Sequence, residues 1–99
     1  MQYISSQRFL DDHIVEEKKA ALAGIESVTI PCSYVGIIDG IEYAMVVDKH
    51  HTMAAAKLLG IPVFFKVGHD SENLIGDDLL VARYIDSDYY DIETGHNVF

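Results

Sequence analysis

The chain has 99 residues, 49% of them hydrophobic, with 16 acidic and 7 basic side chains and a formal net charge of -9. This length and composition fit one domain over residues 1–99, with a hydrophobic core of its own. The charge excludes a surface that tracks nucleic-acid phosphates, and no apolar run is long enough to cross a bilayer. Because the N-terminus also lacks a secretory signal, we expect a soluble cytoplasmic protein without a membrane anchor.

The first quarter of the chain predicts a short strand followed by a helix. Residues 4–6 are a weak strand candidate. Residues 9–24, FLDDHIVEEKKAALAG, place apolar side chains at three- and four-residue steps, which is typical of an amphipathic helix. Gly24 is placed to end this helix in a left-handed cap.

The next segment predicts a β-hairpin. Residues 28–38 are rich in β-branched and aromatic side chains, and Pro31 among them indicates an edge position or a bend. The Asp39-Gly40 pair stands between two apolar runs, which favours a type I′ turn. The second arm covers residues 41–47.

A second helix and a third well-marked strand follow the hairpin. Residues 52–59 contain three consecutive alanines, which are strong helix formers, and Gly60 is placed as the C-terminal cap. Pro62 prevents the helix from continuing. The sequence VFFKV, residues 63–67, then predicts a strand.

The pattern becomes ambiguous after residue 68. Residues 68–73 predict a turn, with Ser71 as an N-cap for a helix over residues 73–85. Residues 79–85 could instead form a strand. The remaining residues, 86–99, read as an acidic C-terminal tail that contains tyrosines.

The stretch VVDKHHTMAAAKLLGIPV, residues 46–63, runs from a strand through a charged corner into an alanine-rich helix. The N-terminus of a helix exposes free N–H groups at the positive end of its dipole and therefore binds anions, phosphates especially. The corner adds one lysine, three further hydrogen-bonding side chains and one carboxylate, from Asp48, Lys49, His50, His51 and Thr52. Residues 48–52 are our candidate phosphate-binding turn.

The stretch YAMVVDKHHTMAAAKLLGIPVFFKV, residues 43–67, resembles the core motif of the ParB/sulfiredoxin-like superfamily. Members read strand, then a (D/G)-G-H-H-R or G-E-R-R turn, then an alanine-rich helix and L-G-x-x-x-V-P-V. The predicted order of elements over residues 2–67 also resembles that fold, whereas nothing from residue 73 onward matches it. The resemblance implies an α/β (α+β) fold with a small, mixed, mostly antiparallel sheet packed with helices.

The resemblance also implies chemistry on nucleotide phosphates. Sulfiredoxins use ATP to activate a sulfinic acid, ParB proteins bind and hydrolyse CTP, and archaeal relatives phosphorylate free serine. Asp48 matches the motif acid, and His50 and His51 match the histidine pair. Lys49 and Thr52, however, stand where the family has glycine and arginine.

These two departures weaken the expected phosphate grip. A Cβ at Lys49 obstructs the close approach that glycine permits. Thr52 has one donor and no charge, so it cannot replace the bidentate clamp of an arginine. The sulfiredoxin nucleophile has no match either, because the single cysteine, Cys32, lies outside the motif in an apolar run and is expected to be a buried strand residue.

An enzyme built on this turn would need acid/base groups. Asp48, His51 and Glu17 are the candidates, with Glu17 supplying a carboxylate from the first helix; otherwise Glu17 belongs to a solvated helix face. ATP or CTP with Mg²⁺ would then be the cofactor. We predict no protein-bound metal, because adjacent residues on a helix diverge by about 100° and His50 and His51 would seldom share an ion.

Acidic and aromatic residues concentrate near the C-terminus. Aromatic side chains give rigid contact area and carboxylates complement a basic protein partner, whereas a solvated tail is the alternative. The candidate partner-binding residues are Tyr84, Asp86, Asp88, Tyr89, Tyr90, Asp91 and Glu93.

Two functions therefore stay open. The favoured one is a non-catalytic protein-binding module, most concretely an immunity or antitoxin protein that neutralises a basic, nuclease-type toxin. Its support is the acidic charge and the altered motif at Lys49 and Thr52. The alternative is an ATP- or CTP-dependent phosphotransferase or nucleotidase that uses the 48–52 turn.

Overall fold

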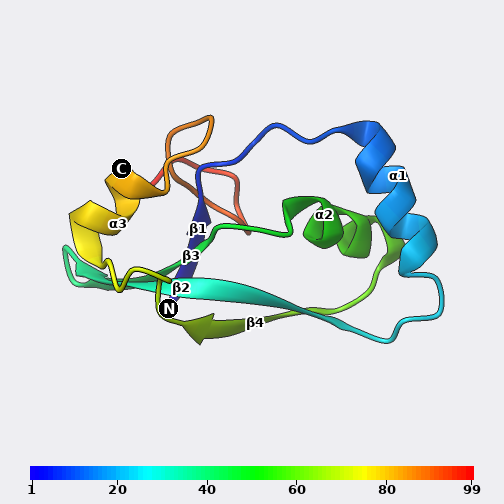
Figure 1. The fold of residues 1–99 in the computed structure, drawn as a ribbon, viewed down its shortest axis with the longest axis horizontal. Helices are drawn as coiled ribbons and strands as arrows, with labels where there is room; N and C mark the ends of the chain where they lie inside the picture. Colours follow the sequence, from blue (N-terminus) through cyan, green and yellow to red (C-terminus); the bar gives the residue numbers. More distant parts are fainter.

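The computed structural model describes residues 1–99 and contains five strands and three helices. In chain order these are β1 (Gln2–Ser5), α1 (Asp12–Ala21), β2 (Val28–Ile38), β3 (Ile41–Val46), α2 (His50–Leu59), β4 (Val63–Gly68), α3 (Gly76–Ala82) and β5 (Tyr90–Asp91). The molecule is elongated, with α1 and α2 toward one end of its long axis and α3 toward the other (Figure 1). None of the three helices has the length and apolar character needed to span a membrane.

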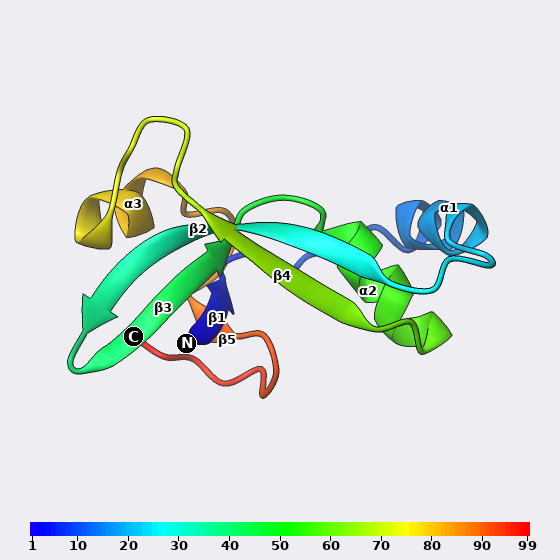
Figure 2. The ribbon, with the colours of Figure 1, turned by 90° about the horizontal axis from the view of Figure 1, so that it is seen from below.

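All five strands form one sheet in the order β4-β2-β3-β1-β5 (Figure 2). The β2–β3 and β1–β5 pairs are antiparallel, whereas β1–β3 and β2–β4 are parallel. The expected mixed sheet is confirmed, but the expectation that it is mostly antiparallel is wrong. Only the tight turn between β2 and β3 requires antiparallel pairing. The connections through α1 and α2 are long enough to let β1 and β4 run parallel to their neighbours in the sheet.

The β2–β3 hairpin has the predicted turn. Both central residues have positive φ, 51° at Asp39 and 81° at Gly40, as a type I′ turn requires. Pairing of β2 with β3 begins at Cys32, while Pro31 pairs only with β4. β2 is an inner strand, but at Pro31 only β4 lies beside it. The predicted edge position is therefore correct for this residue and not for the strand as a whole.

The residues of β3 divide alternately between two hydrophobic clusters, one for each face of the sheet. Ala44 and Val46 join the cluster beneath α2, which also contains Met53 and Ala56 of that helix. Tyr43 and Met45 join the other cluster with Ile4, Val35, Leu79 and Tyr89. The small alanines of α2 let this helix approach the sheet closely, and this contact fixes where its N-terminus lies.

The first two helices are confirmed, with shifted boundaries. Asp11 caps α1 by accepting hydrogen bonds from the backbone N–H groups of His13 and Ile14. This helix ends before Gly24, which has φ 82° beyond the cap residue. Helix α2 begins at residue 50 rather than 52 and ends at Gly60, which has the predicted left-handed conformation with φ 71°.

The third helix is shorter than predicted, and Ser71 is not its N-cap. The side chain of Asp70 instead accepts hydrogen bonds from the N–H groups of Glu72 and Leu74, which holds residues 70–74 in a turn. Asn73 in that turn has φ 60°, which a helix cannot include. Helix α3 therefore starts at residue 76, and residues 79–85 do not form a strand.

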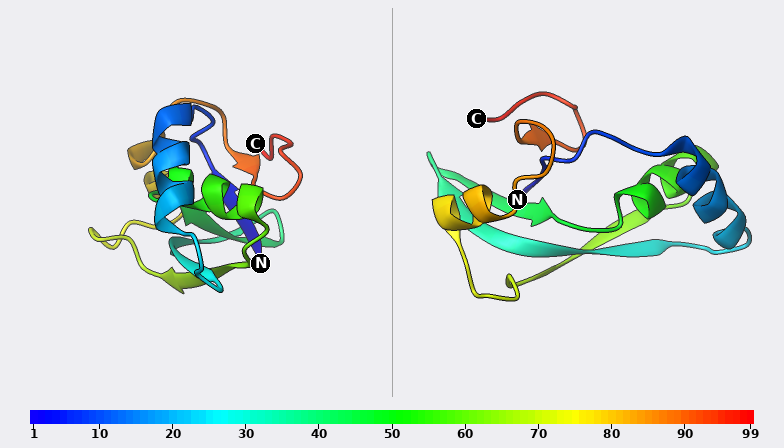
Figure 3. Two further views of the ribbon diagram at one scale, coloured as in Figure 1. Left: turned by 90° about the vertical axis from the view of Figure 1, so that its right-hand side faces the viewer. Right: turned by 45° about the horizontal axis from the view of Figure 1, so that its top comes forward.

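The C-terminal residues fold back over the N-terminal strand (Figure 3). Buried Ser6 anchors them: its carbonyl accepts hydrogen bonds from the N–H groups of Asp86 and Ser87, and its hydroxyl accepts one from the N–H of Ile85. Strand β5 then pairs with β1, and buried Tyr89 and Ile92 join the two clusters. Residues 86–99 are thus part of the fold, which places most of their side chains in defined contacts.

Candidate functional site

The N-terminus of α2 is a turn with free backbone donors. Lys49, the residue before the helix, adopts a left-handed conformation with φ 66°, and no side chain caps the helix. The first intrahelical hydrogen bond runs from Met53 to the carbonyl of Lys49. The N–H groups of His50, His51 and Thr52 therefore have no protein acceptor and are available to an anion.

The residues that carry these donors line a pocket of about 450 Å³, and all seven residues that line it are polar. Two of the lining residues come from outside the turn: Gln7 follows β1, and Lys18 projects from α1. The full lining is Gln7, Lys18, Asp48, Lys49, His50, His51 and Thr52. Packing of α1 against α2 thus places a second lysine beside the turn, and the chain has only 7 basic residues in all.

His50 anchors the turn to the sheet through a buried hydrogen bond. Its Nε2 lies 2.6 Å from the hydroxyl of Ser5 at the end of β1, and both residues are buried. Burial lowers the pKa of the His50 imidazole, although the charge of Asp48 acts in the opposite direction. The pair contains the atoms of a serine nucleophile and its base, but Ser5 is 0% exposed, so its hydroxyl cannot reach a substrate. We interpret the pair as structural.

This burial of a neutral imidazole predicts a pH dependence of stability. The unfolded chain binds the His50 proton more readily than the folded chain, so the contribution is complete above about pH 6.5 and is lost as the pH falls below that value. Chemical unfolding of the native protein and of His50→Gln between pH 7.5 and 5.5 measures it. We expect the native protein to lose more unfolding free energy on acidification than the variant. Parallel losses in both proteins would contradict the assignment.

His51 fixes the position of α1 relative to the turn. Its Nε2 accepts a hydrogen bond of 3.0 Å from the backbone N–H of Asp11, the cap residue of α1. With Nε2 as acceptor, a neutral imidazole carries its proton on Nδ1 and keeps one donor free. One histidine therefore holds the turn to β1 and the next holds it to α1.

The proposed acid/base residues are only partly brought together. Asp48 and His51 line the pocket, but Glu17 does not; its carboxylate is 3.1 Å from Nε2 of His13 on the exposed face of α1. The next residue, Lys18, faces the turn instead. Helix α1 thus supplies positive charge to the pocket, which suits an anion better than a general base would.

The single cysteine and the possible metal ligands were the other candidates for reactive groups. Cys32 is buried as predicted, and burial raises the pKa of its thiol to about 11, which keeps it protonated at neutral pH. No group of three or more histidine, cysteine, aspartate or glutamate side chains is placed to hold a metal ion.

The candidate partner-binding residues do not form one surface. Asp86 accepts hydrogen bonds from the N–H groups of Arg8 and Phe9, and Asp91 accepts them from Glu93 and Thr94, so both carboxylates stabilise local backbone. The Tyr90 ring lies 4.0 Å from the Arg8 guanidinium.

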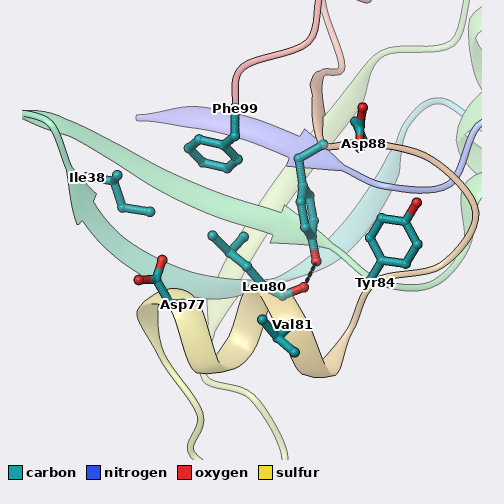
Figure 4. Close-up of a pocket in the computed structure, with 8 residues that line it drawn as sticks. Ile38, Asp77, Leu80, Val81, Tyr84, Asp88 and Phe99 are labelled. Atoms are coloured by element: carbon teal, nitrogen blue, oxygen red, sulfur yellow. Dashed lines mark hydrogen bonds between the residues drawn. The ribbon is translucent and has the colours of Figure 1, made fainter.

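Three of the seven, Tyr84, Asp88 and Tyr89, line a separate groove of about 630 Å³ (Figure 4). The sequence did not predict this groove. Its other walls come from α3, the β2–β3 hairpin and the last residue of the chain, which only the fold brings together.

Comparison of the chain with protein-family models, with curated proteins and with solved structures gives no match.

Proposed function

We propose that the protein is a ParB/sulfiredoxin-like domain that binds a phosphate-bearing ligand, a nucleoside triphosphate in first place, at the 48–52 turn. The order β1-α1-β2-β3-α2-β4 supports the assignment, because it follows the order that the resemblance implies. The D-K-H-H-T sequence lies between β3 and α2, at the corner where the superfamily has its phosphate-binding motif.

The observation that carries the proposal is the convergence of free donors and positive charge on one polar pocket. Three unpaired N–H groups at the positive end of α2 meet Lys18 and Lys49 there, in a protein of net charge -9. A binding pocket for a neutral or cationic ligand would have no need of that combination.

The conformation of Lys49 reduces the importance of the missing glycine. Lys49 occupies the left-handed conformation that glycine adopts most easily, so the turn has a backbone conformation of the kind that a glycine at this position permits. The missing arginine matters more. Thr52 lines the pocket without a charge, and Lys18 supplies positive charge from the facing helix instead.

We propose binding rather than turnover. Asp48 is the only carboxylate that lines the pocket, and its Oδ1 already accepts a 2.7 Å hydrogen bond from the N–H of Lys49. Of the other two acid/base candidates, Glu17 is directed toward His13, and His51 already uses Nε2 to accept the backbone N–H of Asp11.

Titration calorimetry with ATP, CTP and ADP in the presence of Mg²⁺ tests the proposal. Lys18→Gln is expected to weaken binding about three- to tenfold, because it removes one charge from the pocket rim. Lys19→Gln is the matched control, since Lys19 is paired with Glu16 at 3.3 Å outside the pocket. The absence of binding to every nucleotide, or equal losses in both variants, would contradict the proposal.

We propose a second function, that of a protein-binding module with a toxin-neutralising immunity protein as its concrete form, because of one specific feature. The groove beside α3 is apolar inside and has carboxylates at its rim. This function needs no nucleotide, so the two proposals can hold together or fail separately.

A further inference from the structure

We infer that the groove beside α3 docks a segment of a basic protein, and that this segment inserts one large apolar side chain flanked by lysine or arginine. This inference rests on the protein-binding proposal and not on the phosphate-binding one. Of the seven candidate partner-binding residues, the inference keeps only Tyr84, Asp88 and Tyr89.

The groove has the size and lining of an apolar side-chain pocket. Its volume of about 630 Å³ lies in the range of ligand-binding clefts. Six of its eight lining residues are hydrophobic, namely Ile38, Leu80, Val81, Tyr84, Tyr89 and Phe99. Three of these side chains are largely exposed, at 79% for Val81, 54% for Tyr84 and 52% for Phe99. Such a gathering of exposed apolar side chains around a hollow is typical of a binding site.

The aromatic walls of the groove contact one another and α3. The Tyr89 hydroxyl donates a 2.6 Å hydrogen bond to the carbonyl of Leu80, which joins the C-terminal segment to α3 (Figure 4). The Tyr89 ring makes edge contacts with Tyr84 and Phe99, at 6.5 and 6.1 Å between centroids. A rigid aromatic pocket loses little conformational entropy on binding.

The charge around the groove selects a basic partner. Its two polar lining residues are Asp77 and Asp88, which lie on opposite sides of the apolar floor (Figure 4). No lysine or arginine lines the groove. Arg83, which precedes the lining residue Tyr84 in the sequence, is directed toward Asp70 and Glu72 instead. Charge complementarity across such a rim speeds association and excludes acidic partners.

The same charges disfavour a second copy of this chain as the occupant. A dimer through this face would bring Asp77 and Asp88 of both copies together, each on a protein of net charge -9. Like charges facing each other across an interface oppose association. A basic segment with one apolar side chain can place that side chain against the apolar floor and its lysine or arginine residues beside Asp77 and Asp88.

Three fluorescein-labelled peptides test the inference by polarisation: Lys-Lys-Ser-Phe-Lys-Lys, its counterpart with glutamate in place of every lysine, and Lys-Lys-Ser-Ser-Lys-Lys. We expect the first to bind the full chain at least about tenfold more tightly than either of the others. Equal binding of the first and second peptides would overturn the role of charge. Equal binding of the first and third would overturn the role of the apolar pocket.

Variants and amide-shift mapping locate the bound peptide. Val81→Ser is expected to weaken binding about tenfold, and so is the double variant Asp77→Asn with Asp88→Asn. Phe64→Ser on β4 is the control, because Phe64 is 58% exposed but lies outside the groove. This control should leave binding unchanged. Peptide-induced shifts at residues of α3 support the groove. Shifts confined to other acidic surfaces overturn it while leaving protein binding itself intact. A dimer in sedimentation equilibrium that Val81→Ser dissociates assigns the groove to a second copy and also overturns it.

Discussion

Replacing Arg83 by methionine is expected to lower the unfolding temperature at pH 7 by about 10 °C or more. In the native protein, Nε and one terminal nitrogen of Arg83 donate hydrogen bonds of 2.8 and 3.0 Å to the two carboxylate oxygens of Asp70. The Asp70 side chain is 3% exposed. The variant leaves a buried carboxylate with only two backbone N–H groups as partners, and an unpaired buried charge is costly.

The expected loss has a defined pH dependence. Hydrogen bonding to Arg83 lowers the pKa of Asp70 to about 2 from its ordinary value of 3.8. Stability from the pair is therefore complete above about pH 4 and is lost as the pH falls toward 2. Calorimetric scans of native and Arg83→Met protein between pH 7 and 2 should show the difference shrinking over that window. A difference that stays constant down to pH 2 would contradict the ion pair as its source.

Glu72→Gln provides the matched control for this ion pair. Glu72 accepts from the same arginine at 3.1 Å, but its side chain is 68% exposed. Exposed pairs contribute little, so we expect a shift of less than about 4 °C. Because Asp70 and Arg83 connect the 70–74 turn to the end of α3, Arg83→Met should also loosen the groove and weaken peptide binding there.

Thr52→Arg is expected to strengthen nucleotide binding about tenfold or more. An arginine at this position matches the motif that the turn resembles, and the backbone N–H groups of His50, His51 and Thr52 have no protein acceptor there. A guanidinium donates two parallel hydrogen bonds to a phosphate, and charge-assisted bonds are about twice as strong as neutral ones. Calorimetry with ATP and CTP measures the change.

Two further variants separate a phosphate clamp from a general gain of charge. Thr52→Lys adds the same charge without the fork and should gain less affinity than Thr52→Arg. Thr29→Arg adds an arginine on the exposed face of β2, away from the pocket, and should have little effect. Equal gains from Thr29→Arg and Thr52→Arg would show that attraction to the whole surface, not the turn, controls binding.

Local patterns predicted most elements because their determinants are local. The Asp39-Gly40 turn, the Gly60 cap and the alanines of α2 each act within a few residues, and the structure has all three where they were expected. The predicted start of α3 was wrong, and part of the reason is a contact between residues far apart in the sequence. Asp70 binds the N–H groups of Glu72 and Leu74 and is itself bound by Arg83, thirteen residues later, so residues 70–74 form a turn and the helix starts at residue 76 rather than 73.

The candidate site was predictable only for the residues of the turn. The pattern indicated a helix N-terminus at residues 48–52, and the structure confirms this local geometry. Lys18 and Gln7 were missed because only the packing of α1 and β1 brings them to the pocket. The helix pattern favoured Glu17 as the residue of α1 that faces the turn, whereas the contact of α1 with α2 places Lys18 there.

The acidic C-terminal segment shows the same limit. Its composition suggested a surface for a basic partner or a solvated tail. Backbone hydrogen bonds to buried Ser6 instead make it part of the fold and divide its acids between structural contacts and the groove rim. A pattern of residue types cannot show which carboxylates are already engaged by backbone N–H groups.

Amide-shift mapping by NMR with MgATP and MgCTP is the most direct test of the central claim, that the N-terminus of α2 binds phosphate. We predict that the backbone amides of His50, His51 and Thr52 shift most, and that these shifts shrink in Lys18→Gln but not in Lys19→Gln. An unchanged spectrum at millimolar nucleotide, or shifts centred on other lysines, would contradict it.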